Sequence, residues 1–262
     1  MLEDTSSNNA WKRLTYFCKH ASKINSIDII PDNKDTFDKC LGVLRTFFTK
    51  GVGKRSPLKG FLFEGVPGTG KTELIRQIAK GISASVKNVY LLFVDGATIA
   101  APKWGEAESI LKAVFSFCDE FLAREKDNNE PRVIVLFDDI ESLMLARTSE
   151  IAKEWHYSIN AVLFHELDRV DASKTFIFAT TNKPELVDDA LRDRLYSIKF
   201  APPKRESLLE IAKRLLWDAG VSEHMQVEIL KAVEEKLKEK KLPTIRDMER
   251  EVIFQCIERK AW

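Results

Sequence analysis

Runs of apolar residues of strand length alternate along the chain with segments whose apolar residues recur at helical spacing. Four runs carry almost no polar residue and lie at 61–63, 89–94, 133–137 and 175–179. Uninterrupted apolar runs are typical of parallel strands that helices cover on both faces. The less apolar stretch 196–200 fits a last strand. The pattern therefore predicts an α/β fold built on a parallel sheet flanked by helices.

The pattern changes at the two prolines 202 and 203, which mark a domain boundary. Beyond them, residues 206–219, 227–241 and 243–256 read as three amphipathic helices. We therefore expect a small all-α domain at 202–262.

The start of the chain differs from the rest. Residues 1–23 are polar and then aromatic, and we expect an N-terminal extension there. A short helix packed on the core or a frayed chain end would explain it, and a small docking surface is the alternative. Residues 24–201 would then form the larger α/β domain. Within it, the extended apolar segment 24–31 is either a core strand or a wall for an adenine ring.

Composition narrows the class of partner and compartment. The 262 residues include 41 basic and 40 acidic side chains, a net charge of +1, so a nucleic-acid partner is not expected. The four cysteines form no C-x-x-C pair, which favours free thiols in a reducing compartment over disulfides or zinc. The first nine residues lack the apolar core of a secretion signal, and no apolar run reaches membrane-spanning length. These features predict a cytoplasmic protein without membrane partners.

Candidate chemistry begins directly after the first apolar run. Residues 65–72 read GVPGTGKT and match the phosphate-loop pattern G-x-x-x-x-G-K-[ST], between a strand and a helix as the motif requires. Glycines let the backbone turn its N–H groups toward phosphates, and the helix N-terminus adds partial positive charge. We expect ATP and Mg²⁺ as cofactors. The predicted cofactor-binding residues of this segment are Gly65, Pro67, Gly68, Thr69, Gly70, Lys71, Thr72 and Glu73.

Polar side chains follow two further predicted strands. Asp138 and Asp139 come after the run at 133–137, and Asn182 follows the run at 175–179. A carboxylate at the end of a strand beside a phosphate loop is the expected Mg²⁺ partner, a role we assign to Asp138 together with Thr72. We expect Asp139 to polarise the attacking water and Asn182 to hold that water against the γ-phosphate.

Two other features have both a structural and a functional interpretation. Trp104 follows a proline and is flanked by charged residues ahead of a predicted helix. It either folds back into the core or forms an exposed aromatic loop that grips a ligand. Arg192 and Arg194 lie close together in the segment DDALRDRL, where a solitary domain would use them as surface charge.

These residues together resemble the AAA+ ATPases over nearly the whole chain. Residues 65–72 are similar to the Walker A motif of that family, and 133–139 to its Walker B motif. Asn182 is similar to sensor 1, Arg194 to the arginine finger and Arg246 to sensor 2, which lies in a helical lid. The resemblance implies a P-loop NTPase sheet followed by an all-α lid domain, and a ring that is usually a hexamer. In such rings the arginine finger of one subunit enters the ATP site of the neighbouring subunit and stabilises the charge of the transition state. The resemblance therefore implies that Arg192 and Arg194 are catalytic residues.

Within that family, Lys103, Trp104 and Gly105 resemble the aromatic pore loop of members that pull polypeptide through the ring. The run DDIESLMLAR at 138–147, and the step of 12 residues from 182 to 194, resemble the branch that remodels HORMA-domain proteins. The resemblance implies an ATP-hydrolysing protein remodeller with a protein substrate, which in this branch would be HORMA-like.

Three departures from the family pattern leave alternatives open. Asp139 replaces the usual Walker B glutamate and is one methylene shorter, so hydrolysis could be slow and the chain an ATP-gated scaffold. The pore loop is one residue shorter than usual after Trp104, and we expect no sizeable N-terminal adaptor domain before the sheet. A DNA-directed AAA+ regulator is a further alternative, against which the balanced charge and the lack of an added helix-turn-helix argue.

Overall fold

A computed structural model describes residues 18–26, 31–99, 106–123, 130–143 and 154–261. In this part of the chain, six strands form one sheet in the order β1-β3-β4-β5-β2-β6. Strands β2 to β6 are parallel to one another, and β1 pairs antiparallel with β3. The strands are β1 Cys18–His20, β2 Gly60–Glu64, β3 Val89–Asp95, β4 Arg132–Asp138, β5 Thr175–Thr181 and β6 Leu195–Lys199. The predicted α/β class with a parallel sheet is confirmed.

Strand β1 is a feature that the sequence pattern did not predict. Its residue Cys18 lies opposite Leu92 of β3, so part of the expected N-terminal extension forms an edge strand of the sheet. Ala21, directly after the strand, is fully buried. Three residues are too few to show the alternation by which a half-buried strand is recognised, because the pattern needs four to eight residues.

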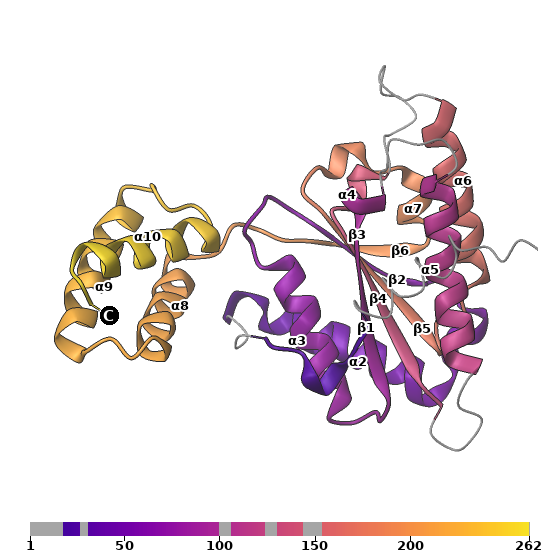
Figure 1. Ribbon diagram of the computed structural model, residues 1–262, viewed down its shortest axis with the longest axis horizontal. Helices are drawn as coiled ribbons and strands as arrows, with labels where there is room; N and C mark the ends of the chain where they lie inside the picture. The colour runs from indigo at the N-terminus through magenta and orange to yellow at the C-terminus, as the bar shows by residue number, and fades with distance from the viewer. Residues whose placement is uncertain (1–17, 27–30, 100–105, 124–129, 144–153, 262) are drawn as a thin grey trace, which may run out of the picture.

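Helices cover both faces of the sheet, which gives three layers (Figure 1). Helices α2 (Lys34–Lys50) and α3 (Lys71–Ser83) pack on one face. The other face is covered by α5 (Glu106–Ala123), α6 (Glu154–Arg169) and the short α7 (Asp189–Arg192). A further short helix, α4 (Gly96–Ile99), follows β3 directly.

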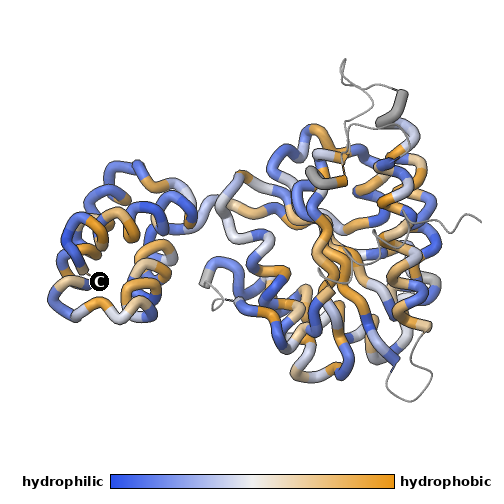
Figure 2. The backbone as a smooth tube through the Cα atoms, in the orientation of Figure 1, coloured by the Kyte–Doolittle hydropathy of each residue, from blue (hydrophilic) through white to orange (hydrophobic). Residues whose placement is uncertain are grey.

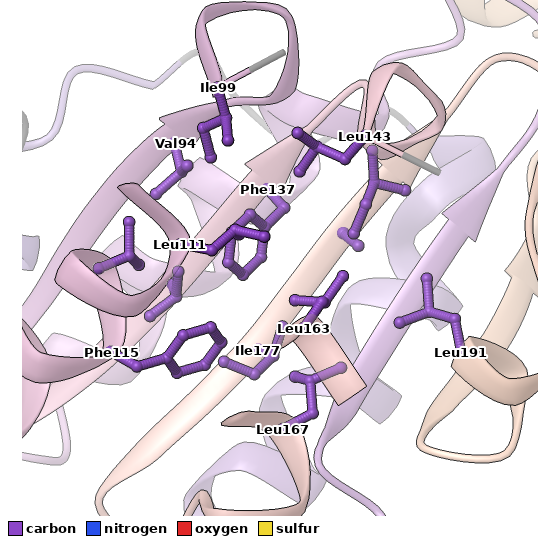
Figure 3. Packing of buried hydrophobic residues seen from close by; sticks show 14 of the residues in the cluster. Val94, Ile99, Leu111, Phe115, Phe137, Leu143, Leu163, Leu167, Ile177 and Leu191 are labelled. Carbon is purple, nitrogen blue, oxygen red and sulfur yellow. The ribbon is translucent and has the colours of Figure 1, made fainter. Parts of the chain in front are cut away.

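The central strands are apolar on both faces, as Figure 2 shows by the orange colour of the sheet. Along β5, Phe176 and Phe178 join the cluster under α2 and α3, whereas Ile177 and Ala179 join the cluster under α5 and α6. Figure 3 shows the second cluster, in which Ile177 lies among side chains of the covering helices. Burying a large apolar side chain contributes about 1.5–3 kcal/mol to the stability of the fold. These two clusters therefore stabilise the sheet and, with it, the positions of the strand ends.

Three helices after the sheet form a separate core: α8 (Arg205–Asp218), α9 (Glu223–Lys238) and α10 (Ile245–Glu258). We call residues 202–262 the helical lid. Its own apolar cluster supports the proposed boundary at 201/202, and the division into 1–23, 24–201 and 202–262 stays a prediction. No helix of the described residues is long and apolar enough to cross a membrane.

The helical lid contacts the phosphate loop directly. The backbone N–H of Ile245, at the start of α10, donates a hydrogen bond of 3.0 Å to the carbonyl of Gly68. Gly68 has a φ of +74°, and a Cβ there would lie 2.8 Å from Oγ1 of Thr244. At the other end of the lid, the carboxylate of Asp32 accepts a hydrogen bond of 2.8 Å from the backbone N–H of Lys204. At Gly70, a Cβ would lie 3.3 Å from Cδ1 of Ile245 and 3.5 Å from Nδ2 of Asn33, so the loop, the lid and the segment before α2 meet there.

Candidate active site

The phosphate loop connects β2 to α3. Its last glycine, Gly70, is the residue before the first turn of α3 and has a φ of +86°, which L side chains rarely adopt. This conformation lets the chain enter α3 with Lys71 and Thr72 on its first turn. The first N–H groups of a helix have no partner within it, so they are available to an anionic ligand.

The loop forms one wall of a cleft of about 500 Å³. The cleft brings together most of the predicted site residues, whereas Gly65 lies at the base of the loop and is not part of the lining. Its other walls are the ends of β4 and β5, the start of α10 and the segment before α2. The predicted residues that line it are Pro67, Gly68, Thr69, Gly70, Lys71, Thr72, Glu73, Asp138, Asp139, Asn182 and Arg246.

Lys71 is held in the cleft by three acceptors. Its Nζ donates to the carbonyls of Gly65 and Val66, at 2.7 and 3.0 Å, and to Oδ1 of Asn182 at 2.8 Å. The residue is only 5% exposed, and burial lowers the pKa of its ammonium group, an effect that the nearby carboxylates of Asp139 and Glu141 oppose. A phosphate oxygen would suit this position, because it could replace a neutral acceptor with a charged one.

Asp138 receives two hydroxyl groups on the same oxygen. Oγ1 of Thr72 donates to Oδ1 of Asp138 at 2.7 Å, and Oγ1 of Thr180 donates to the same atom at 2.6 Å. Hydroxyl and carboxylate oxygens beside a phosphate site are the ligands that Mg²⁺ prefers. The donor set of Thr72 and Asp138 therefore fits the expected metal ion.

Asp139 follows in a left-handed backbone conformation, with φ 51° and ψ 54°. Its N–H donates to Oγ1 of Thr180 at 3.0 Å, and its Oδ1 accepts from Nδ2 of Asn182 at 2.6 Å. Burial raises the pKa of the Asp139 carboxyl, the carboxylates of Asp138 and Glu141 raise it further, and Lys71 opposes them. A raised pKa makes the carboxylate a stronger base, which suits a group that polarises water.

Asn182 links these groups into one chain of hydrogen bonds. Its side chain accepts from Lys71 and donates to Asp139, and its backbone N–H donates to Oε1 of Glu141 at 3.0 Å. The sequence pattern did not predict a role for Thr180, for Glu141 or for Asn33, which also lines the cleft. Their closeness in sequence to predicted site residues could have identified two of them, because Thr180 lies two residues before Asn182 and Glu141 two residues after Asp139.

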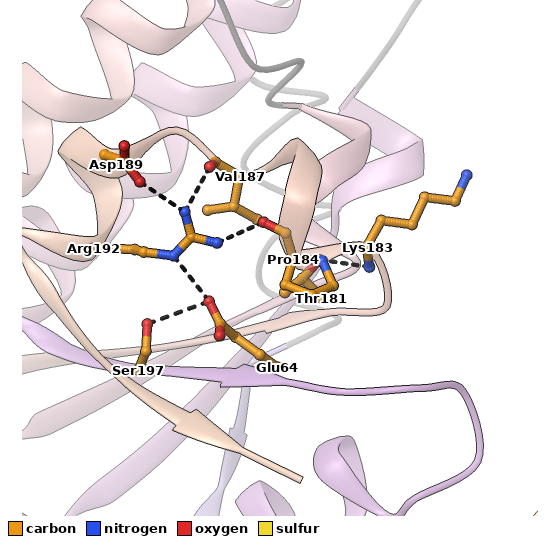
Figure 4. Close-up of polar contacts among 8 residues, drawn as sticks. All are labelled: Glu64, Thr181, Lys183, Pro184, Val187, Asp189, Arg192 and Ser197. Carbon is orange, nitrogen blue, oxygen red and sulfur yellow. Dashed lines mark hydrogen bonds and ion pairs between the residues drawn. The ribbon is translucent and has the colours of Figure 1, made fainter. Parts of the chain in front are cut away.

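Arg192 points into its own chain (Figure 4). Its Nε donates to Oε1 of Glu64 at 3.1 Å, and its Nη1 donates to the carbonyl of Val187 at 2.9 Å and to Asp189 at 3.0 Å. Its Nη2 donates to the carbonyl of Pro184 at 2.5 Å. These bonds tie the end of β2 to the loop between Asn182 and α7. In this arrangement the guanidinium is occupied by groups of its own chain and does not line the cleft.

Arg194 also lies outside the cleft of its own chain. Its guanidinium pairs with both carboxylate oxygens of Asp168, at 2.7 Å each, and donates to the carbonyl of Ala190 at 2.8 Å. It also stacks over the ring of Phe164, 5.1 Å from the centroid. The hydrogen bonds with Asp168 raise the pKa of Arg194 and lower that of Asp168. Arg194 directly precedes β6 and lies beside the start of β2, whereas the phosphate loop follows the other end of β2.

Four predicted site residues remain. One of them lies at the cleft, and the other three lie outside the described part of the chain. Arg246, on the first turn of α10, lines the cleft and is exposed. Beside it, burial raises the pKa of Glu249, and Arg246 opposes this effect. Lys103, Trp104 and Gly105 lie outside the described residues, and α5 begins directly after them at Glu106.

Comparison with known proteins identifies the family. The model of the "ATPase family associated with various cellular activities (AAA)" matches residues 61–203. The "AAA ATPase forming ring-shaped complexes" of Corynebacterium efficiens is 32% identical over 173 residues, which are 63% of this chain and 32% of that protein. The ATPase histone chaperone YTA7 of Saccharomyces cerevisiae is 33% identical over 174 residues, 64% of this chain and 12% of that protein. The chain thus spans at most 32% of the length of these relatives.

Two solved structures share the fold at low sequence identity. A chain in the HORMA:CdnC:Trip13 complex of E. coli MS115-1 has a TM-score of 0.63 and 16% identity, with 86% of this chain and 88% of that chain covered. The FIGL-1 AAA domain in complex with ADP also has a TM-score of 0.63, with 19% identity and coverage of 96% and 91%. The expected P-loop NTPase sheet with a helical lid is confirmed by this likeness. Because the family model matches more than half of its residues, the chain belongs to the AAA family of ATPases.

Proposed function

We propose that the chain is an ATP-hydrolysing subunit of a homo-oligomeric ring that remodels protein substrates. The observation that carries this proposal is the position of Arg194. The chain supplies Lys71, Asp139 and Asn182 to its cleft at the carboxyl ends of the strands, but Arg194 lies at the amino-terminal end of β6, paired with Asp168. An arginine from a second copy would complete the site, and a head-to-tail contact of this kind forms a ring when its rotation closes and an open helix when it does not.

In this proposal ATP lies along the phosphate loop, with Gly65–Glu73 and Arg246 as its contacts. Mg²⁺, held by Thr72 and Asp138, neutralises charge on the β- and γ-phosphates when it is bound. Lys71 then binds the phosphates, Asp139 orients and polarises a water, and Asn182 fixes the carboxylate of Asp139 through the 2.6 Å hydrogen bond. Arg194 acts on the site of the neighbouring subunit.

Ring formation, compartment and substrate are supported by observations outside the cleft. The corynebacterial relative is described as forming ring-shaped complexes, which supports a ring here, and we propose a hexamer. All four cysteines are free, which supports a cytoplasmic location. One fold neighbour comes from a complex that contains a HORMA protein, and we propose a HORMA-like substrate gripped by the pore loop Lys103, Trp104 and Gly105.

The test of the shared site is a mixing experiment with two inactive variants. Arg194→Ala lacks the finger, and Asp139→Asn lacks the base. In a mixed ring, some interfaces join an intact Asp139 to an intact Arg194 of the neighbour, so ATPase activity should partly return. A mixture of Lys71→Ala with Asp139→Asn is the matched control, because both changes disable the same side of the interface and no combination restores it. Failure of the first mixture to recover activity would rule out action across subunits.

Substrate and pore loop need separate experiments. Asp139→Asn protein should retain ATP binding, so a HORMA-like protein should co-purify with it in ATP and not in ADP. Trp104→Ala should lose remodelling of that protein while much of the ATPase activity remains. Normal remodelling by Trp104→Ala would contradict the pore-loop proposal, and capture of DNA with salt-sensitive affinity would support the DNA-directed alternative.

An ATP-gated scaffold is the second candidate, and the short side chain of Asp139 favours it. The Asp139 carboxylate accepts a hydrogen bond from Asn182, so a water molecule at the γ-phosphate could lie too far from the carboxylate for it to polarise. If this holds, wild-type turnover should be close to zero and Asp139→Glu should raise it. Substantial turnover by the wild-type chain would exclude the scaffold.

A further inference from the structure

Thr180 contacts both aspartates at the end of β4, Asp138 and Asp139. Its hydroxyl donates to Oδ1 of Asp138 at 2.6 Å and accepts from the backbone N–H of Asp139 at 3.0 Å. The residue lies on the neighbouring strand β5 and is 1% exposed. The two strands are in register, since Phe137 pairs with Ala179 one residue earlier. A single buried hydroxyl therefore joins the expected metal-binding carboxylate to the backbone of the expected base.

The two contacts constrain different parts of the site. Thr72 also donates to Oδ1 of Asp138, but it is expected to ligate the metal as well. Thr180 is thus the donor to Asp138 that has no other assigned task. The two hydroxyls on Oδ1 fix the orientation of the Asp138 carboxylate, which would hold Mg²⁺. The branched side chain of a buried threonine has few allowed rotamers, so its hydroxyl keeps a fixed direction.

The second contact holds Asp139 in an uncommon conformation. A φ of 51° is rarely adopted by residues other than glycine, although aspartate tolerates it better than most. The hydrogen bond from the N–H of Asp139 to Thr180 helps to hold the backbone there, with the carboxylate directed at Asn182. Because the side chain of Asp139 is short, its backbone position sets where the carboxylate lies.

We propose that Thr180 is a positioning residue that sets the orientation of Asp138 toward Mg²⁺ and of Asp139 toward the attacking water. The proposal rests on the proposed ATPase function. Thr180 is among the residues that line the cleft, and in this role it acts through its hydrogen bonds with the two aspartates. A merely structural role, in which the hydroxyl only satisfies buried polar groups, is the competing explanation.

Three variants separate these explanations. Thr180→Val keeps the shape of the side chain and removes the hydroxyl, and Thr180→Ser keeps the hydroxyl. Thr181→Val is the matched control: Thr181 is the next residue of β5 and fully buried, and its hydroxyl accepts from the nearby N–H of Lys183. The readouts are the Mg²⁺ concentration that half-saturates binding of a fluorescent ATP analogue, kcat and KM for ATP, and the thermal midpoint.

Thr180→Val should raise the half-saturating Mg²⁺ concentration and lower kcat, each by about tenfold, as is typical when a group that orients a metal ligand is lost. Thr180→Ser should have a half-saturating Mg²⁺ concentration and a kcat close to those of the wild type. Thr181→Val should have the wild-type half-saturating Mg²⁺ concentration even if its thermal midpoint is lower. The proposal is overturned if Thr180→Val changes only the thermal midpoint, as Thr181→Val can. If the wild-type chain has no turnover, the ATPase function fails, whereas the Mg²⁺ titration still tests Thr180.

Discussion

The guanidinium of Arg194 and the carboxylate of Asp168 face each other in a two-pronged pair, with Nε–Oδ1 and Nη2–Oδ2 both 2.7 Å apart. The pair lies on the surface, and the side chains of Arg194 and Asp168 are 23% and 55% exposed. For Arg194 to reach the site of a neighbouring subunit, this pair must open. The contact within one chain and the proposed contact between chains therefore compete for the same guanidinium.

Removing Asp168 should favour the contact between chains. An exposed ion pair contributes about 0.5–1 kcal/mol, so Asp168→Ala should lower the protein concentration for half-maximal ATPase activity by about two- to fivefold. Asp189→Ala is the control, because Asp189 is also an exposed carboxylate but forms its ion pair with Arg192 and not with Arg194. An unchanged or higher half-maximal concentration in Asp168→Ala would show that the pair does not compete with assembly.

Replacing Glu141 should change the pH dependence of hydrolysis. The base must be deprotonated, so the rate is lost as the pH falls through the pKa of Asp139. Burial raises that pKa, and the charges of Asp138 and Glu141 raise it further. Glu141→Gln removes one of these charges and keeps an acceptor for the N–H of Asn182, so the acidic limb of kcat/KM should move to lower pH. An acidic limb that stays in place would mean that a different group controls it.

A methyl group on Gly68 should disturb the contact between the phosphate loop and the helical lid. A Cβ there would lie 2.8 Å from Oγ1 of Thr244, and the φ of +74° adds backbone strain. Displacing the lid would relieve the clash and would cost roughly 1.4 kcal/mol of the free energy of ATP binding. Gly68→Ala should therefore weaken ATP binding by about tenfold. Titration with a fluorescent ATP analogue measures the change.

The control for Gly68→Ala is Gly220→Ala. Gly220 has a similar φ of +68°, but a Cβ there would meet nothing within 4 Å. Its substitution should lower stability through strain and leave ATP binding unchanged. Thr244→Gly removes both close atoms, Oγ1 at 2.8 Å and Cβ at 2.9 Å, so adding it to Gly68→Ala should restore part of the lost affinity for ATP. No restoration would mean that the effect arises in the loop alone.

Arg192 should behave as a structural residue. Glu64 is 4% exposed, and Arg192→Ala would leave its carboxylate buried without this charged partner. We expect the free energy of unfolding to fall by about 2 kcal/mol, measured by urea denaturation, and to recover in part when Glu64→Gln is added. If Arg192→Ala instead keeps its stability and regains ATPase activity on mixing with Asp139→Asn, Arg192 is a second finger.

The placement of Arg192 and Arg194 shows where a sequence pattern stops being informative. Two arginines separated by one residue looked equivalent in the segment DDALRDRL. The short helix α7 ends at Arg192 and β6 begins at Leu195, so the two side chains leave the chain in different directions. One pairs with Glu64 at the end of β2, and the other pairs with Asp168 on α6. Such partners are far apart in sequence, so no local pattern identifies them.

The amino-acid sequence by itself determined the α/β class, the phosphate loop, the helical lid and the residues at the strand ends. These follow from local rules: apolar periodicity, glycine positions and the meeting of parallel strand ends at one edge of a sheet. Only the tertiary structure decided that Cys18–His20 forms an edge strand, that Thr180 joins two aspartates and that Ile245 bonds the carbonyl of Gly68. These contacts depend on register and on packing between distant segments. Their geometry is set by the whole core, because a hydrogen bond requires two groups to meet within a fraction of an ångström.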